Sequence, residues 1–150
     1  MEDDETVEIS EGPQLGIEGG PLGADEYEHA AAIPVIIISG VQEPNIEEIL
    51  KADPDCYELD LNHNRIEKLE KSELLTRVER WYVSWNLIKK IENLYILTSL
   101  VELELSDNQI SRLENFDSLV NLPILDVSFN RLTKIENLKN LLKLEKLYIG

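Results

Sequence analysis

The chain has 150 residues and a formal net charge of −16, with 30 acidic and 14 basic side chains. Its first 50 residues contain 13 of the acids and no Lys or Arg, so the imbalance lies mainly at the front of the chain. An acidic protein without a basic face is a poor candidate for binding nucleic acid. The single cysteine, Cys56, excludes an internal disulfide framework and suits a reducing compartment.

The first segment, residues 1–29, is acidic and interrupted by Gly and Pro, with almost no apolar periodicity. This composition predicts a disordered acidic tail. We interpret the tail as a solvating segment, and a docking or regulatory arm is the alternative. The acidic start of the chain is the opposite of the basic start of a signal peptide, which favours the nucleus or the cytoplasm as its location.

The next segment, residues 30–55, is expected to form an N-terminal cap. The apolar run 30–39 is too short to cross a bilayer, which needs about 20 residues. Pro34 splits the run, and we expect Val35 to Ile38 to lie as a strand or extended segment on the first repeat, with an exposed sticky segment as the alternative. Within 45–51, Asn45 is a good N-cap for a short amphipathic helix that would cover the end of the stack, with one apolar face formed by Ile46, Ile49 and Leu50.

Residues 56–150 are organised by a repeat of 22 residues. The clearest copy reads L-x-x-L-x-L-x-x-N-x-I, from Leu100 to Ile110. This is the leucine-rich-repeat pattern, and it predicts an α/β solenoid with a parallel sheet on its concave side and short helical or 3-10 segments on its convex side. There are four full repeats and an incomplete fifth. One asparagine marks each full repeat, and these four are Asn64, Asn86, Asn108 and Asn130.

These asparagines are predicted to form a structural ladder. Each follows a short strand, where the chain turns and its backbone N–H and C=O groups point inward without a sheet partner. An asparagine amide offers two donors and an acceptor, so it can satisfy the turn of its own repeat and of the neighbouring one. On the convex side, the first repeat departs from the others, because Lys71 and Ser72 stand where later repeats have Asn and an apolar residue.

A protein-binding surface is predicted on the concave face. Residues beside the inward-pointing leucines face outward, and here they combine carboxylates with aromatic side chains. Aromatic residues are frequent interface anchors, and carboxylates suit a partner that carries basic residues. The alternative is ordinary strand surface, since Tyr and Trp favour strands, but curved solenoids characteristically bind on this side. The candidate residues are Tyr82, Trp85, Glu104, Asp126, Phe129 and Tyr148.

Sequence motifs for catalysis and metal binding are absent. There is no Gly-rich phosphate loop, nucleophile elbow, H-E-x-x-H or C-x-x-C pattern. Cys56 occupies an apolar core column of the repeats, His63 lies in a column of varied chemistry, and two such residues do not make a zinc site. We therefore expect a protein without catalytic activity, cofactor or metal, and without a membrane-spanning segment.

The repeats resemble the short-repeat class of intracellular leucine-rich-repeat proteins, in which repeats end in I-E-N-L. The runs NLIKKIENL at 86–94 and LDVSFN at 125–130 are similar to the opening repeats of the protein phosphatase 1 regulatory subunit 7 family, and the resemblance covers about 56–150. It implies that the partner is the catalytic subunit of type-1 protein phosphatase, held by the concave face in the nucleus and cytoplasm.

Position by position, Asp126 and Tyr148 match the phosphatase-binding pattern best, with Tyr82 and Glu104 next. Trp85 and Phe129 come from the geometry of the repeats instead. The I-E-N-L ending also occurs in axonemal dynein and ciliary proteins and in the spliceosomal A-prime family. A structural scaffold of cilia or of the spliceosome is therefore the alternative function.

The last repeat is expected to be incomplete. A fifth asparagine would fall at 130 + 22 = 152, whereas the chain has 150 residues. We expect a truncated product or incomplete gene model whose final apolar edge is open and self-associates. The residues of that edge are Leu138, Leu141, Leu144, Leu147 and Ile149.

Overall fold

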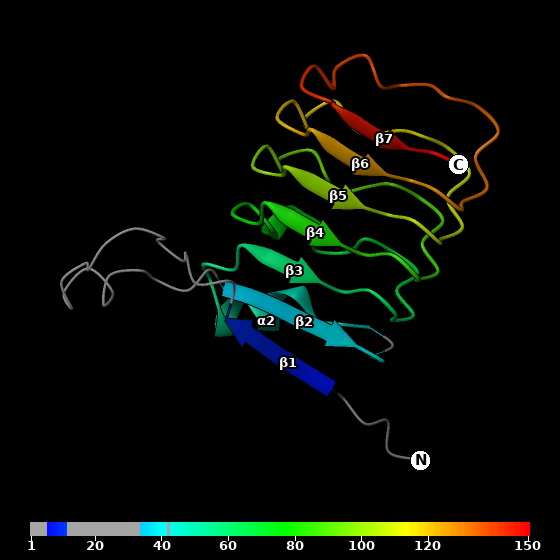
Figure 1. Ribbon diagram of the computed structural model, residues 1–150. Coiled ribbons are helices and arrows are strands. Elements are labelled where there is room, and N and C mark those ends of the chain that lie inside the picture. Colours follow the sequence, from blue (N-terminus) through cyan, green and yellow to red (C-terminus); the bar gives the residue numbers. More distant parts are fainter. Residues whose placement is uncertain (1–5, 12–33, 42) are drawn as a thin grey trace, which may run out of the picture.

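The computed structural model describes residues 6–11, 34–41 and 43–150, and its strands form one sheet along one side of a coiled chain (Figure 1). The sheet has seven strands in the order β1 to β7, and β2 to β7 are parallel. This confirms the predicted solenoid. The strands are β1 (Thr6–Glu11), β2 (Pro34–Ser39), β3 (Glu58–Asp60), β4 (Arg80–Tyr82), β5 (Glu102–Glu104), β6 (Ile124–Asp126) and β7 (Lys146–Tyr148).

The core lies between this sheet and the return segments of the repeats. Each of the short strands β3 to β6 buries its central side chain, because successive residues of a strand point to opposite faces. Stacking at the repeat period then brings Leu59, Trp81 and Leu103 together as a fully buried column. Apolar side chains of the return segments, such as Leu97 and Phe116, complete the same core.

The asparagine ladder forms as predicted. The side-chain amide of Asn108 donates to the carbonyl of Val83 in the preceding repeat (3.0 Å) and to Leu105 in its own repeat (3.1 Å). Its side-chain oxygen accepts from the backbone N–H of Ile88 (3.1 Å). Equivalent bonds are made by Asn64, Asn86 and Asn130.

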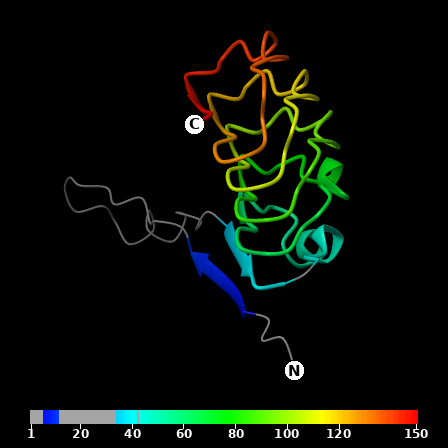
Figure 2. The same cartoon turned by 90° about the vertical axis from the view of Figure 1, so that its right-hand side faces the viewer.

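The convex side contains α2 (Ile46–Ala52) and the 3-10 turn η1 (Ser72–Leu74), which lie away from the sheet (Figure 2). The expectation of helical return segments holds only for η1 among the described repeats, since the later ones return through turns. A second asparagine series lies at the start of these later return segments. Asn93, Asn115 and Asn137 adopt φ of 60°, 65° and 59°, in the left-handed region, as does Lys71 (φ 62°) at the same position of the first repeat. The three asparagines donate their amides to carbonyls of the preceding repeat, on Leu69, Ile91 and Leu113.

The N-terminal cap agrees with its prediction in position and in the residues that form it. The side chain of Asn45 accepts a hydrogen bond from the N–H of Glu48 (3.2 Å), which makes it the N-cap of α2. Ile46 and Ile49 are buried against the first repeat. The predicted strand in the apolar run is β2, which pairs in parallel with β3.

The start of the chain differs from expectation. Residues Thr6–Glu11 form β1, which pairs antiparallel with β2, whereas the composition of 1–29 predicts disorder. The sequence TVEISE alternates apolar and polar residues, as strands do. Without β1, the outer edge of β2 would present a row of unpaired N–H and C=O groups. The remainder of the predicted tail lies outside the described residues.

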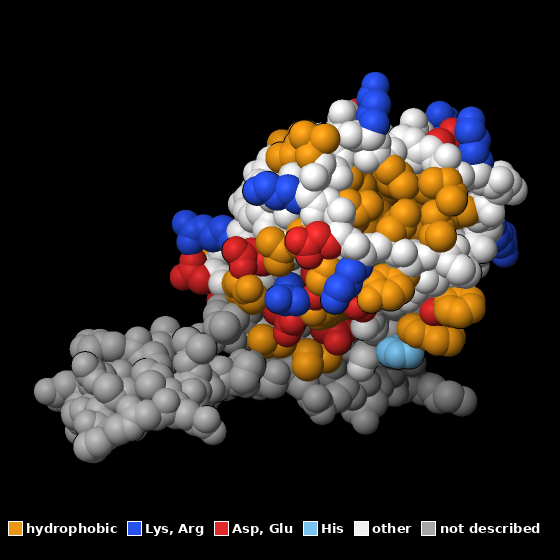
Figure 3. Space-filling view, turned by 45° about the horizontal axis from the view of Figure 1, so that its top comes forward, with side chains coloured by type: hydrophobic (Ala, Val, Ile, Leu, Met, Phe, Trp, Pro, Cys, Tyr) orange, Lys and Arg blue, Asp and Glu red, His pale blue; other side chains and the backbone are white. Residues whose placement is uncertain are grey.

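The β7 end of the stack carries an apolar surface. Figure 3, turned so that this end comes forward, shows hydrophobic side chains gathered there. Ile135 and Leu142 are strongly exposed, and Leu147 is only partly buried, whereas Leu125 at the same place on β6 is fully buried. Among the described residues, no helix has the length and apolar character needed to cross a bilayer.

Candidate protein-binding surface

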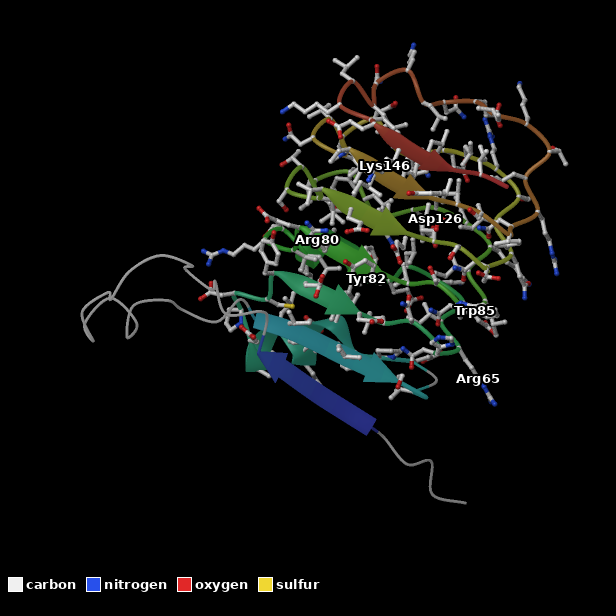
Figure 4. All side chains as sticks on the ribbon, in the orientation of Figure 1. Arg65, Arg80, Tyr82, Trp85, Asp126 and Lys146 are labelled. Atoms are coloured by element: carbon white, nitrogen blue, oxygen red, sulfur yellow. The ribbon has the colours of Figure 1, made fainter. Side chains whose placement is uncertain are left out.

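The outward face of β3 to β7, which we call the open face, collects side chains that are far apart in the sequence. The strand register places Asp60, Tyr82, Glu104, Asp126 and Tyr148 in one central column, one residue from each strand. Figure 4 shows Tyr82 and Asp126 on this face of the sheet. Four of the six candidate residues therefore stand in this central column, namely Tyr82, Glu104, Asp126 and Tyr148. They align because residues paired on neighbouring strands are one repeat of 22 residues apart.

Tyr82 is held by carboxylates on both neighbouring strands. Its hydroxyl lies 2.9 Å from a carboxylate oxygen of Glu58 on β3 and 3.2 Å from one of Glu102 on β5. Burial and the hydrogen bond to Glu58 raise the pKa of the Tyr82 hydroxyl, as do the charges of Glu102 and Glu58. Arg80 also forms an ion pair with Glu102. The Tyr82 ring is thus restrained in place before any partner arrives.

Glu104 is surrounded by other acids. Burial raises its pKa to about 7, and the charges of Glu102, Asp126 and Asp60, together with a hydrogen bond to Glu102, act in the same direction. The Glu104 carboxyl is therefore more readily protonated than that of an ordinary glutamate. A cation brought close to this column would favour the charged form and lower the pKa again.

Asp126 also has a structural role. Its Oδ1 accepts hydrogen bonds from the backbone N–H of Ser128 (2.9 Å) and from the Ser128 hydroxyl (2.7 Å). Asp60 makes the equivalent bond to the N–H of Asn62 (2.9 Å). These contacts orient the two carboxyl groups, and Asp126 retains a second oxygen for a partner.

Trp85 and Phe129 lie beyond the carboxyl ends of the strands rather than in the central column. Figure 4 shows this place for Trp85. Their side chains are 57% and 71% exposed. Both residues adopt a left-handed backbone, with φ of 56° and 54°, which is uncommon for bulky residues. The Trp85 ring stacks on His63, with centroids 5.6 Å apart.

The six candidate residues thus form two groups. Tyr82, Glu104, Asp126 and Tyr148 share the central column, and Tyr148 is 50% exposed. Trp85 and Phe129 form a separate aromatic rim at the carboxyl ends of the strands, two repeats apart. Both groups lie on β4 to β7 or just after the ends of these strands.

Sequence reasoning missed the network that surrounds Tyr82. Glu58, Arg80 and Glu102 occupy a neighbouring column with a strict spacing of 22 residues. That spacing was a usable signal, because it puts an arginine between two glutamates on adjacent strands. The spacing alone does not reveal that the Tyr82 hydroxyl joins the same network.

Cys56 has no feature of a reactive thiol. It is fully buried, and burial raises its pKa to about 11, with further contributions from Asp53 and Glu58. The protonated thiol is a poor nucleophile and metal ligand. Across residues 6–11, 34–41 and 43–150, the structure shows no cluster of three or more side chains that could hold a metal ion.

Comparison with known proteins supports the repeat assignment. Residues 98–140 match the family model for leucine-rich repeats (2 copies). No curated protein matches the chain significantly. Among solved structures, an internalin (inlF) from Listeria monocytogenes is 28% identical, with a TM-score of 0.66, over 75% of this chain and 33% of that one.

Two further Listeria monocytogenes structures are similar. Internalin C2 is 25% identical, with a TM-score of 0.62, over 67% of this chain and 45% of that one. The functional domain of InlJ is 22% identical, with a TM-score of 0.62, over 74% of this chain and 23% of that one, and shows the fold alone. The chain spans less than half the length of each of these three structures.

Proposed function

We propose that this leucine-rich-repeat protein is a non-catalytic subunit that binds another protein through the open face of its sheet. The observation that carries the proposal is the acidic central column, where Glu104 has a pKa of about 7 because it is partly buried and stands beside Glu102, Asp126 and Asp60. Such a column is unfavourable in the free protein and becomes favourable when a cationic partner neutralises it.

The aromatic side chains supply the apolar part of the interface. Tyr82 is already fixed by two hydrogen bonds, so little side-chain entropy is lost when it is covered. Trp85, Phe129 and Tyr148 are at least half exposed and add apolar area at the margins of the acidic column. Interfaces of this kind combine aromatic anchors with a charged surround.

For the partner we propose the catalytic subunit of type-1 protein phosphatase. The support is the resemblance of residues 56–150 to the phosphatase regulatory family, together with the match of Asp126 and Tyr148 to its binding pattern. The same resemblance gives the nucleus and cytoplasm as the proposed location.

A calorimetric titration of the whole chain with purified type-1 phosphatase catalytic subunit tests this proposal. We expect binding by the wild type and a loss of at least about tenfold in affinity for the double variant Trp85→Ser/Phe129→Ser, since aromatic hot spots commonly contribute about 2 kcal/mol each. Tyr95→Ser is the matched control, because Tyr95 is 62% exposed but belongs neither to the open face nor to the aromatic rim.

Capture of partners from a cell extract separates the two functional classes. Recovery of the phosphatase supports the regulatory function. Recovery of dynein chains or splicing proteins instead, with no binding in the titration, would contradict it and favour the scaffold alternative. Equal affinities for the wild type and the double variant would show that Trp85 and Phe129 are not part of the interface.

A further inference from the structure

A cavity of about 260 Å³ lies behind the sheet, between the α2 cap and the first two repeats. Its walls include apolar side chains from three parts of the fold, namely Ile46 of α2, Leu61 after β3, and Ile66 and Leu69 of the first return segment. Its volume is just below the range of about 300–1,000 Å³ that is usual for small-molecule pockets, so it suits only a small ligand. The cavity is separate from the open face, so an inference about it does not depend on the proposed partner.

The repeat pattern explains why there is space at this place. Ser72 occupies the position that later repeats fill with Leu94, Phe116 and Leu138. Trp81 stands where neighbouring strands have Leu59 and Leu103. A small residue on the return segment and a large one on the strand both depart from the repeat here, and both residues line the cavity.

The same two residues leave polar atoms without partners. The Ser72 hydroxyl and the Trp81 indole N–H are buried and have no hydrogen-bond partner among the described residues. Both side chains are essentially fully buried. Buried polar groups are nearly always paired, and an indole N–H is a donor only, so it requires an acceptor. The cavity therefore has apolar walls and contains at least one buried donor, the Trp81 indole N–H, that has no acceptor.

The rim of the cavity limits the charge of anything that enters. Exposed Glu43, Glu67 and Glu70 stand there with a single basic residue, Lys68. The excess of negative charge disfavours an anion such as a carboxylate. A carbonyl oxygen is the neutral group that best satisfies the indole N–H, and it retains a second lone pair for the serine hydroxyl.

We propose that this cavity is a binding site for a small neutral molecule that joins an apolar body to a carbonyl oxygen. The apolar body contacts Ile46, Leu61, Ile66 and Leu69, and the carbonyl accepts a hydrogen bond from Trp81. Because α2 supplies one wall, the bound molecule also holds the cap against the first repeat.

Nuclear magnetic resonance on the whole ¹⁵N-labelled chain tests the site directly, because the protein has two tryptophans and hence two indole N–H signals. The variant Trp85→Phe identifies the signal of Trp81. Acetophenone, used as the probe, should shift the Trp81 signal to saturation and leave that of Trp85 in place. Ethylbenzene has nearly the same shape without the carbonyl oxygen and should bind roughly tenfold more weakly, as expected for one lost hydrogen bond.

The matched variant is Ser72→Leu, which introduces the residue found at this position in the second and fourth repeats and fills the cavity. It should abolish the acetophenone shift while the dispersed amide spectrum shows that the chain remains folded. The proposal is overturned if neither acetophenone nor cyclohexyl methyl ketone gives a saturable shift at millimolar concentration, which would mean that the cavity holds water only. Equal affinity for ethylbenzene, or unchanged binding by Ser72→Leu, would also overturn it.

Discussion

The side-chain amide of Asn86 donates a hydrogen bond of 3.0 Å to the carbonyl oxygen of Leu61, which lies 25 residues earlier in the chain. The same nitrogen bonds to Val83 in its own repeat, and the side-chain oxygen accepts from the N–H of Ile66. One side chain therefore satisfies backbone groups of two successive repeats. Removing such an amide leaves groups on both repeats without partners, which is the basis of the first prediction.

Asn108→Ala should lower the free energy of unfolding by about 2–4 kcal/mol, because a buried N–H and several carbonyls lose their partner together. Asn108 makes these bonds with Val83, Leu105 and Ile88. Urea denaturation measures the change through its midpoint, provided that the slope is unchanged. Asn140→Ala is the control, since Asn140 makes only an exposed side-chain bond to Asp117. Equal midpoints for the two variants would contradict the ladder.

The second asparagine series, Asn93, Asn115 and Asn137, contributes to stability through both its backbone conformation and its hydrogen bonds. Asn93 combines a left-handed backbone (φ 60°) with a hydrogen bond of 2.7 Å to the carbonyl of Leu69. Asn93→Ala loses both advantages and should cost about 2 kcal/mol, whereas Asn93→Gly loses only the hydrogen bond and should cost about 1 kcal/mol. Thermal unfolding of the two variants measures the difference. If Asn93→Gly is no more stable than Asn93→Ala, the left-handed backbone at this position does not contribute to the difference in stability.

Deletion of residues 1–11 should lower the thermal midpoint, because β1 would no longer pair with β2. If residues 1–11 were part of a disordered tail, their deletion would leave the thermal midpoint unchanged. The measurement therefore distinguishes a paired β1 from a disordered tail. Deletion of residues 1–5 alone is the control, since it leaves β1 intact. If both deletions have the midpoint of the whole chain, the pairing of β1 does not contribute to stability.

The stability of the chain should fall with rising pH through Glu104. Its pKa is about 7 in the fold, against an ordinary value of 4.5. The folded state therefore keeps a proton that the unfolded state has lost, and the contribution to stability decreases between these two values and is lowest above pH 7. Glu104→Gln should be more stable than the wild type at pH 8 and equal to it below pH 4.5.

Urea denaturation of wild type and variant across this pH range makes the comparison. Glu67→Gln is the control, because Glu67 is an exposed carboxylate outside the acidic column. The free energies of unfolding of Glu104→Gln and wild type should differ more as the pH rises. A difference that stays constant would mean that Glu104 is not held in its uncharged form.

The apolar surface at the β7 end is expected to cause self-association of the 150-residue chain. Sedimentation velocity should show a concentration-dependent increase in mass. The double variant Ile135→Lys/Leu142→Lys should abolish it by charging two strongly exposed residues of the last repeat. Ile96→Lys, at an exposed apolar residue of an earlier repeat, should have no effect. A monomeric wild type at high concentration would contradict this expectation.

Much of the fold could be predicted because every repeat must bury the same apolar side chains and pair the same backbone groups. The asparagine spacing requires stacked turns, and the L-x-L pairs require strands whose centres point inward. The column of Tyr82, Glu104, Asp126 and Tyr148 follows from that spacing alone, since the strand register equals the repeat length. The cap could be predicted because Asn45 and the apolar face of α2 are local signals.

The sequence by itself therefore determined the solenoid, its asparagine ladder and the members of the open face. Only the tertiary structure decided what depends on neighbours from other repeats. The pairing of β1 with β2 is long-range and hidden within an acidic, Gly-rich composition. The pKa of Glu104 depends on charges from three different strands. The cavity exists because Ser72 is small where later repeats have a large apolar residue, and the larger Trp81, nine residues further on, does not fill the space.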